Sequence, residues 1–567
     1  MSVRRSFALF VPTAILLFSG STALIGVGAA RAAESEEGES EALYVSQVSV
    51  ATEGDLAPDA EIVREGRPIS ISEAVALAIR NNLDVEVERY GPAIADADRD
   101  GAWGAYDPTL SADMRYDVQK TPNTFVLNNA AANRDRVKGG GIGVDQLIPF
   151  VGARVGLRYN ATSTSTRNTL QLLDEQFDSS FFITATVPLA RGLIWNQEWT
   201  NVKTAEIGSA VAFEGFRTSV MDTVQRTVDA YWGLVATRDQ VRVAQKSLET
   251  ARALLDQTKT QYEVGVVSRV EVVEAEAGVA DREFGVIRNA NDYRNAQDAL
   301  IDAVLGRELG ALTDLQFAPT EAPDGFGDQT VDVRRSVDLA FANRPELMQL
   351  AQQIEQGELD LKFAKNQRLP QFDVEGRFGY VGISGEGNVG RTDFDDPTGP
   401  PLPPVPNRPF DQSDNDFFTA DGSDNYRVQG VFSIPFPNTT ARKRVVRSEL
   451  ELQRAKTRQA RLEQTIILEV RRAARNLEAS QQGIEAAERR RLAAEEQLRA
   501  ERIRLEHGES TPFEVLQRES DLVEAESQKI NALQSYRSAE VGLERAQGTI
   551  LGTHAVVLAR EAEPGAE

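Results

Sequence analysis

The chain has 567 residues, 41% of them hydrophobic and 26% charged, which would suit three or four domains if each packed its own core. Its formal net charge of −24 at pH 7 would repel the phosphates of nucleic acid, so we expect no nucleic-acid partner. The absence of cysteine excludes disulfides, thiolate chemistry, thiolate metal sites and the acylated cysteine of a lipoprotein.

Residues 1–32 have the features of a cleaved signal peptide. Two arginines at positions 4 and 5 precede an apolar run around FALFVPTAILLF, and Ala30-Arg31-Ala32 fits a signal peptidase site. The alternative is a membrane anchor, but Pro12 and Gly20 interrupt the apolar run. Residues 33–67 are acidic and poor in aromatic residues, so we expect a flexible leader there.

The rest of the sequence is an internal repeat. The helical pattern ISEAVALAIRNNLDV recurs 262 residues later as VRRSVDLAFANRPEL, and the same offset places YDPTLSADMRY over RLPQFDVEGRF. We therefore expect two copies, residues 68–306 and 331–552, joined by a linker at 307–330 and followed by a flexible tail at 553–567. Each copy runs helix, strand region, long helix, glycine break and long helix.

The strand regions, about 106–190 and about 369–436, show alternating polar and apolar residues. Examples are LSADM, FFITATVPL and YRVQGVFSIPF, and Pro188 and Pro435 stand where the strands end. Copy one has two further candidates at about 137–163, GGGIGVDQLIPF and GARVGLRYNAT, which have no counterpart in copy two. The sequence leaves open whether they join a membrane sheet. The segment Asp395–Asn425 is rich in proline, glycine and aspartate and predicts an exposed loop.

Two helices of unusual length follow the strands. They are expected from about Asn201 to Gly265 and from about Lys443 to Gly508, roughly 65 residues or on the order of 100 Å each. Apolar residues at alternating spacings of three and four predict coiled-coil seams. The seam residues are Met221, Val224, Val228, Tyr231 and Val235 before the first break, Val270, Val273, Ala277, Ala280, Phe284 and Ile287 after it, and Ile466, Val470, Ala473 and Leu477 in copy two.

The two glycine breaks are alike. They lie in TQYEVGVVSRVEVVEAE and IRLEHGESTPFEVLQRE, and an offset of 243 superposes Gly265 on Gly508 and Glu271 on Glu514. Glycine tolerates the left-handed backbone that a tight turn requires. The sequence therefore predicts that each long helix turns back on itself.

No apolar segment of about 18 residues follows the signal peptide, so we expect no helical membrane span. Strands of about ten residues suit an outer membrane, but four to six per chain fall short of the eight in the smallest barrels. Several chains would have to share one barrel. The predicted fold class is an α+β membrane protein with a long coiled-coil helical barrel and an outer-membrane β-barrel completed by trimerisation, built from an internal two-fold repeat.

From about residue 68 to 552 the sequence resembles the TolC-type outer-membrane efflux protein family. The resemblance rests on EAVALAIRNNLDV with SVDLAFANRPEL, on the strand-to-helix segments VPLARG and SIPFPN, and on the two glycine breaks. It implies a homotrimer, commonly with four strands per chain, that forms a twelve-stranded barrel in outer-membrane lipid above a helical barrel in the periplasm. It also implies a periplasmic membrane-fusion adaptor and, through it, an inner-membrane pump of RND or ABC type, in tripartite efflux or type I secretion.

The resemblance assigns roles to residues at the breaks. Adaptor docking would involve Val264, Gly265, Ser268, Gly508 and Thr511, although the glycines could serve the turn alone. A narrow pore would be lined by Glu271, Glu274 and Glu514, although these could equally be solvated faces of acidic helices. The tyrosine and arginine of the family's closing latch correspond here to Leu505 and Ser510, so any latch must differ.

Two other classes of function fit the sequence less well. An enzyme or a zinc protein has little material, because the only histidines, His507 and His554, stand beside no candidate nucleophile or second ligand. We therefore expect no catalytic residue, no metal and no cofactor. A periplasmic coiled-coil adaptor or structural protein without a membrane barrel would explain the long helices but not the duplicated strands. The sequence does not identify the cargo.

Overall fold

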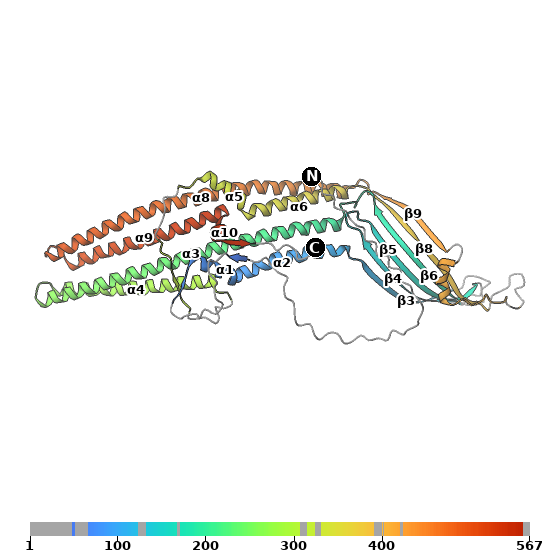
Figure 1. The fold of residues 1–567 in the computed structure, drawn as a ribbon, viewed down its shortest axis with the longest axis horizontal. Coiled ribbons are helices and arrows are strands. Elements are labelled where there is room, and N and C mark those ends of the chain that lie inside the picture. The colour runs from blue at the N-terminus through green and yellow to red at the C-terminus, as the bar shows by residue number, and fades with distance from the viewer. Residues whose placement is uncertain are drawn as a thin grey trace. The chain divides into compact units, whose positions relative to one another are not determined.

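The structure is a computed structural model that describes residues 48–50, 66–122, 132–166, 171–306, 315–323, 330–389, 400, 402–419 and 423–558. The predicted signal peptide and most of the predicted leader lie outside these residues. In Figure 1 the long helices run side by side, and a six-stranded sheet continues from one end of them.

Helices make up most of the described chain. They are α1 (Ile71–Asn81), α2 (Leu83–Trp103), α3 (Gln197–Glu263), α4 (Arg269–Val304), α5 (Val333–Asn343), α6 (Pro345–Gln367), α7 (Phe410–Thr419), α8 (Thr439–Glu506), α9 (Pro512–Gln547) and α10 (Ile550–Thr553), with a 3₁₀ turn at Gly104–Tyr106. The predicted long helices are confirmed, since α3 has 67 residues and α8 has 68. The pairs α3–α4 and α8–α9 form two hairpins, and α9 packs against α3.

The main sheet is antiparallel, with the order β3-β4-β5-β6-β8-β9. Its strands are β3 (Thr109–Pro122), β4 (Ala132–Leu147), β5 (Arg154–Ser165), β6 (Leu173–Pro188), β8 (Gln371–Gly387) and β9 (Asp424–Ser433). Residues 137–163, which have no counterpart in copy two, form most of the hairpin β4–β5 inside this sheet. The four strands per chain that the resemblance implied are wrong for this chain, because copy one carries an additional hairpin.

The sheet has one apolar face and one polar face. Residues that pair across an antiparallel sheet lie on the same face, and one register row crosses all six strands with only apolar side chains: Leu110, Val144, Leu157, Ile183, Phe378 and Tyr426. The opposite face carries polar residues such as Asp113, Asn160 and Ser180 in a single row. Alternation of this kind is typical of a sheet with lipid on one side, and α7 covers part of the apolar face at Tyr159, Phe177 and Tyr380.

Four of these strands are each joined directly to one helix. Along the chain α2 leads into β3, β6 into α3, α6 into β8 and β9 into α8. The same helices pack in the order α2-α3-α6-α8, which matches the strand order β3-β6-β8-β9. The hairpin β4–β5 has no helix of its own and lies between β3 and β6.

The largest core cluster lies where the two copies meet, around α1, α3 and the parallel strand pair of β2 (Arg67–Ile69) and β7 (Phe317–Pro319). Tyr231 and Phe317 are almost fully buried there. The strand β1 (Val48–Val50), which precedes β2 in the chain, pairs with β10 (Val556–Leu558) near the other end of the chain. The predictions of a flexible leader and a flexible tail are therefore wrong for these two strands, because each satisfies the backbone hydrogen bonds of the other.

Two further predictions need correction. The seam on α3 is confirmed by buried Val224 and Val228, but on α4 the residues Val270, Phe284 and Ile287 are more than 60% exposed within the chain. The reason is that α4 packs on α3 with one face and has few contacts elsewhere. The predicted loop Asp395–Asn425 contains the helix α7, which packs on β8 and β6.

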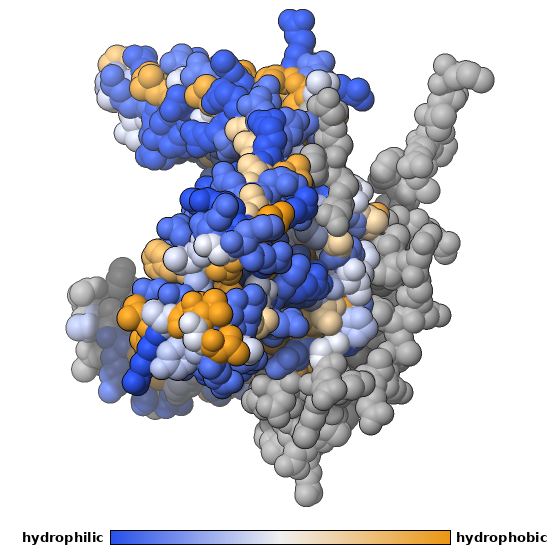
Figure 2. Space-filling model, turned by 90° about the vertical axis from the view of Figure 1, so that its left-hand side faces the viewer, coloured by the Kyte–Doolittle hydropathy of each residue, from blue (hydrophilic) through white to orange (hydrophobic). Residues whose placement is uncertain are grey.

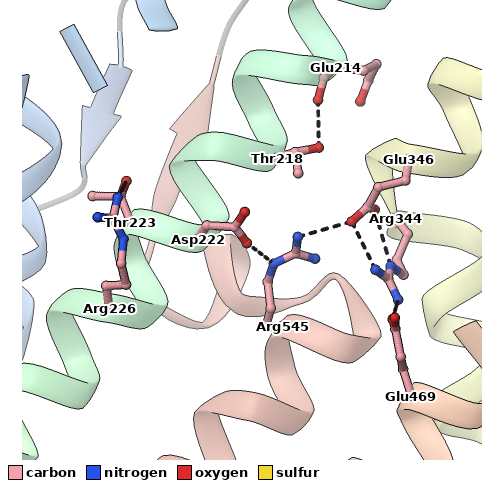
Figure 3. A network of polar contacts seen from close by, with 9 residues as sticks. All are labelled: Glu214, Thr218, Asp222, Thr223, Arg226, Arg344, Glu346, Glu469 and Arg545. Atoms are coloured by element: carbon pink, nitrogen blue, oxygen red, sulfur yellow. Dashed lines mark hydrogen bonds and ion pairs between the residues drawn. The ribbon is translucent and has the colours of Figure 1, made fainter. Parts of the chain in front are cut away.

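Among the described residues, none of the helices combines the length and the apolar character that a membrane crossing requires. A polar network connects four of the helices (Figure 3). Arg545 on α9 contacts Asp222 on α3 at 2.6 Å and Glu346 on α6 at 3.1 Å. Arg344, which precedes α6, contacts Glu346 at 2.9 Å and also pairs with Glu469 on α8.

Candidate functional site at the hairpin tips

The α3–α4 tip is a helix C-terminus closed by glycine. Gly265 has φ 79°, the left-handed conformation that glycine adopts without steric cost. Its N–H donates to the Tyr262 carbonyl at 2.9 Å, and the Val266 N–H donates to the Gln261 carbonyl at 2.8 Å. These two bonds define a Schellman motif, which satisfies carbonyls that the helix end would leave unpaired.

The α8–α9 tip repeats this geometry. Gly508 has φ 76°, its N–H donates to the Leu505 carbonyl at 3.0 Å, and the Glu509 N–H donates to the Arg504 carbonyl at 2.9 Å. A Cβ atom built on Gly265 or on Gly508 would meet no atom within 4 Å. A side chain at either glycine therefore costs backbone strain only and would point into open space.

The helices that follow the turns begin with matching caps. Ser268 is the N-cap of α4, and the Glu271 carboxylate accepts from its backbone N–H at 3.4 Å and its hydroxyl at 3.2 Å. Thr511 is the N-cap of α9, and its hydroxyl oxygen accepts from the Glu514 N–H at 3.4 Å. Both follow the S/T-x-x-E pattern of a capping box, in which the acid also favours the positive end of the helix dipole.

The sequence shows this local role as SRVE and TPFE, a signal that neither the pore interpretation nor the alternative of solvated helix faces takes into account. The structure places Glu271 and Glu514 at equivalent N3 positions, one at each tip. Glu274 lies one turn further along α4 and is exposed. Capping explains why an acid stands at the two N3 positions, but it gives no reason for an acid at Glu274.

The two tips differ in surface chemistry. Figure 2 looks at the tip end of the helices and shows apolar side chains gathered at the α3–α4 tip, in the lower part of the view. The exposed apolar residues there are Tyr262, Val264, Val266 and Val270, and both Val264 and Val266 are at least 70% exposed. The α8–α9 turn itself is polar, with the sequence HGES, and only Ile503 and Phe513 beside it are about half exposed. The α3–α4 tip therefore offers the apolar area that a protein partner could bury.

Behind the tips the four helices share a small core. Ala251 and Leu254 of α3, Leu498 of α8 and Val515 and Leu516 of α9 are buried together. Helix α4 approaches α9 closely at Gly278, where a Cβ would lie 2.8 Å from the Leu516 side chain. The two hairpins are therefore held side by side up to one to three turns from their ends.

Among the described residues of this region, Glu501 on α8 and Glu519 on α9 are buried carboxylates. Glu519 on α9 is 4% exposed, and burial raises its pKa, while the charges of Arg502 and Arg282 and a hydrogen bond with Thr250 act in the opposite direction. Its repeat counterpart Glu276 is exposed and pairs with Lys259 at 3.3 Å. The duplication therefore preserved the residue type but not its environment.

The two latch positions take part in contacts within the α8–α9 hairpin. The Ser510 hydroxyl donates to the Glu501 carboxylate, and Leu505 packs against the core behind the tip. Arg504 also contacts Glu501, at 3.3 Å. Within the described ranges, no three histidine, aspartate or glutamate side chains gather in a way that could hold a metal ion.

Comparisons with known proteins match most of the chain. A family model described as outer membrane efflux protein matches residues 126–306 and 336–549. No match to the chain was found among curated proteins.

Similar solved structures include the CmeC outer membrane channel of Campylobacter jejuni, with a TM-score of 0.57 and 15% identity over 85% of this chain and 86% of that one. The VceC outer membrane protein of Vibrio cholerae has a TM-score of 0.58 and 14% identity over 84% and 96% of the two chains. The open-state MtrE outer membrane channel of Neisseria gonorrhoeae has 0.56 and 14% over 92% and 98%. At these identities the likeness shows a shared fold, a helical tunnel with a β domain.

Proposed function

Because the chain belongs to the outer membrane efflux protein family, we propose that three copies form one channel that carries substrates from the periplasm across the outer membrane. The observation that supports this most directly is the six-stranded sheet with one apolar and one polar face. One chain has too few strands to close a barrel, so neighbouring copies must supply the rest.

The edges of the chain suit such an assembly. Strands β3 and β9 are the two edges of the sheet, and an unpaired edge invites another strand. Among the long helices, α4 exposes an apolar stripe that includes Val273, Phe284 and Ile287, and α8 exposes Leu492 and Ile503. We propose that α4 and β3 of one copy meet α8 and β9 of the next. A head-to-tail contact of this kind closes into a ring when the rotation permits.

In this assembly the helices extend the duct through the periplasm and the tips meet the partner proteins. Val264 at the apolar α3–α4 tip, with Gly265, Ser268, Gly508 and Thr511 at the turns, would dock a periplasmic adaptor that links the channel to an inner-membrane pump. In this proposal the two repeats span residues 68–306 and 331–552. The activity is transport and requires no bond-breaking step.

Glu271, Glu274 and Glu514 are proposed to line the periplasmic constriction. Threefold symmetry would bring three copies of each residue around one axis, and rings of carboxylates attract cations in a narrow pore. Capping by Glu271 does not conflict with this, because an N3 carboxylate keeps its charge while it accepts a hydrogen bond. Such a pore would favour cations.

The other candidate is a periplasmic adaptor or structural protein without a membrane barrel. In a protein surrounded by water, an apolar register row across six strands would remain a large exposed apolar patch, which soluble proteins rarely carry. The sheet therefore favours the channel.

The test is the mass and conductance of the purified protein. In detergent, light scattering should give the mass of three chains, and in planar bilayers the same particles should form ion-conducting pores. A stable monomer that retains its full β content would refute the trimeric channel.

A further inference from the structure

The hairpin β4–β5 stands out because the repeat does not account for it. By the 262-residue offset β3 corresponds to β8, and the strand that precedes the long helix is β6 in copy one and β9 in copy two. Copy two has no strand that corresponds to β4 or β5. Since β3 and β6 run antiparallel on either side of the hairpin, a sheet without it could still pair them directly.

The hairpin is a full part of the sheet. It pairs with both neighbours over most of its length, and it contributes Val144 and Leu157 to the apolar register row. On the polar face β4 has glycines at positions 139, 141 and 143. The side chains of β3 and β5 meet across them, as an ion pair between Asp113 and Arg158 and a 3.4 Å contact between Arg115 and Thr162.

The turn of the hairpin is fixed to the helical part. Phe150 lies 4.7 Å from the Trp199 ring at the start of α3, and the Gln146 amide donates to the Tyr106 carbonyl at 2.5 Å. At Gly152, with φ 68°, a Cβ would lie 2.8 Å from the Gly192 carbonyl oxygen. This close approach ties the turn to the junction between sheet and helices, as expected for strands that belong to the wall.

The width of the sheet supports the same conclusion. Strands 4.8 Å apart and tilted by about 40° take up about 38 Å of arc for six strands and about 25 Å for four. The four helices α2, α3, α6 and α8, at spacings near 9 Å, take up about 36 Å. With the hairpin, the sheet is as wide as the helical layer that leads into it.

We propose that β4–β5 is part of the barrel wall and that the assembled channel has an eighteen-stranded barrel. This inference rests on the proposed function. The backbone radius would be about 18 Å, against about 12 Å for twelve strands. The polar lumen face, with Asp113, Arg115 and Arg158, suits water and hydrophilic solutes. The exit then admits bulky hydrophilic cargo, and any limit on size lies in the helical part.

Single cysteines test the position of the hairpin without background, because the natural chain has none. On β5, Leu157→Cys should react with a lipid-soluble maleimide and Arg158→Cys with a charged, water-soluble one. The matched control is Ile183→Cys and Thr184→Cys on β6, a strand that belongs to the wall with or without the hairpin. Reconstituted protein in phospholipid vesicles is used throughout.

The outcomes separate the two proposals. If on both strands the first cysteine reacts with the lipid-soluble reagent and its neighbour with the water-soluble one, the hairpin is part of the wall. If both β5 cysteines react with the water-soluble reagent while β6 keeps the two-sided pattern, the eighteen-stranded barrel is overturned and the channel remains. If β6 also loses the two-sided pattern, the membrane channel itself is refuted.

A deletion variant tests the width of the barrel. Removal of residues 132–166 leaves β3 and β6 to pair, and the largest neutral polyethylene glycol that enters from the barrel side and lowers conductance should shrink in radius by about 6 Å. An unchanged polymer cutoff in this variant would overturn the proposal. The cysteine pairs decide the question by themselves if the deletion variant does not fold.

Discussion

Replacing Glu346 by glutamine should loosen four helices at once. This carboxylate accepts from Arg344 at 2.9 and 3.2 Å and from Arg545 at 3.1 Å, and these arginines also contact Glu469 on α8 and Asp222 on α3 (Figure 3). Glutamine has nearly the same size but no charge. The change therefore removes the charge that the two arginines share and creates no cavity.

The magnitude follows from the pKa of Glu346. Burial raises this pKa, but hydrogen bonds and charge interactions with Arg344 and the charge of Arg545 outweigh burial and lower it from 4.5 to about 2. A shift of this size corresponds to about 3 kcal/mol of native-state stabilisation at neutral pH. Because 21% of the side chain is exposed, solvent screening reduces the expected loss to about 2 kcal/mol.

The pH dependence has a definite sign. A carboxyl whose pKa is lower in the folded state stabilises the fold above its unfolded pKa, and the effect is lost as the pH falls through the folded pKa. The difference between wild type and Glu346→Gln should therefore be full at pH 7 and should vanish between pH 4.5 and 2.

Hydrogen exchange of α6 and α9, with urea unfolding followed by helical circular dichroism, measures both effects. The control is Glu451→Gln, which removes an exposed partner of Arg447 within α8 and should change nothing measurable. If Glu346→Gln behaves like this control at pH 7, or if its effect does not depend on pH, the network does not stabilise the helices as argued.

Three further predictions concern the tips and the helices. Gly265→Asn and Gly508→Asn should fold and trimerise, because asparagine tolerates the left-handed turn, yet export should fall if the tips dock an adaptor. The corresponding valine variants should lose the turn as well. Normal export by the asparagine variants would mean that the glycines serve the turn alone. In planar bilayers the double variant Glu271→Gln, Glu514→Gln should lose cation selectivity while glutamine keeps the helix caps; unchanged selectivity would place both carboxylates outside the pore. Burial and the charge of a neighbouring carboxylate raise the pKa of Glu544 to about 7, so its ionisation destabilises the fold as the pH rises through 7. Glu544→Gln should therefore raise the melting temperature by about 2 °C at pH 8 but little at pH 5. An equal shift at both pH values would exclude ionisation as the cause.

The features that the sequence predicts well are local ones. A helix of 67 residues repeats the same 3.6-residue pattern many times, and the glycine of a Schellman turn is required by backbone sterics at that one position. The duplication strengthens both signals, because Gly265 and Gly508 sit in the same turn with the same bonds. The long helices, the two turns and the family could therefore be recognised without any tertiary information.

The sheet was predictable only in part. The alternation in β3, β6 and β9 is clear, but β4 is rich in glycine, so its pattern is weak and its partners cannot be read from it. Its place is decided by pairing with β3 and β5 over long register rows. Helix α7 is a similar case, since it packs where Gly382 has no side chain and leaves room for the Ser413 backbone.

The sequence by itself determined the repeat, the long helices, the glycine turns and the family, because each depends on residues close together in the chain. Only the tertiary structure decided that the sheet has six strands, that the apolar stripe of α4 remains uncovered within one chain, and that Asp222, Glu346, Glu469 and Arg545 form one network. A periodic pattern reveals that a face is apolar but not which surface covers it, and residues more than 70 positions apart meet only through the packing of the helices that carry them.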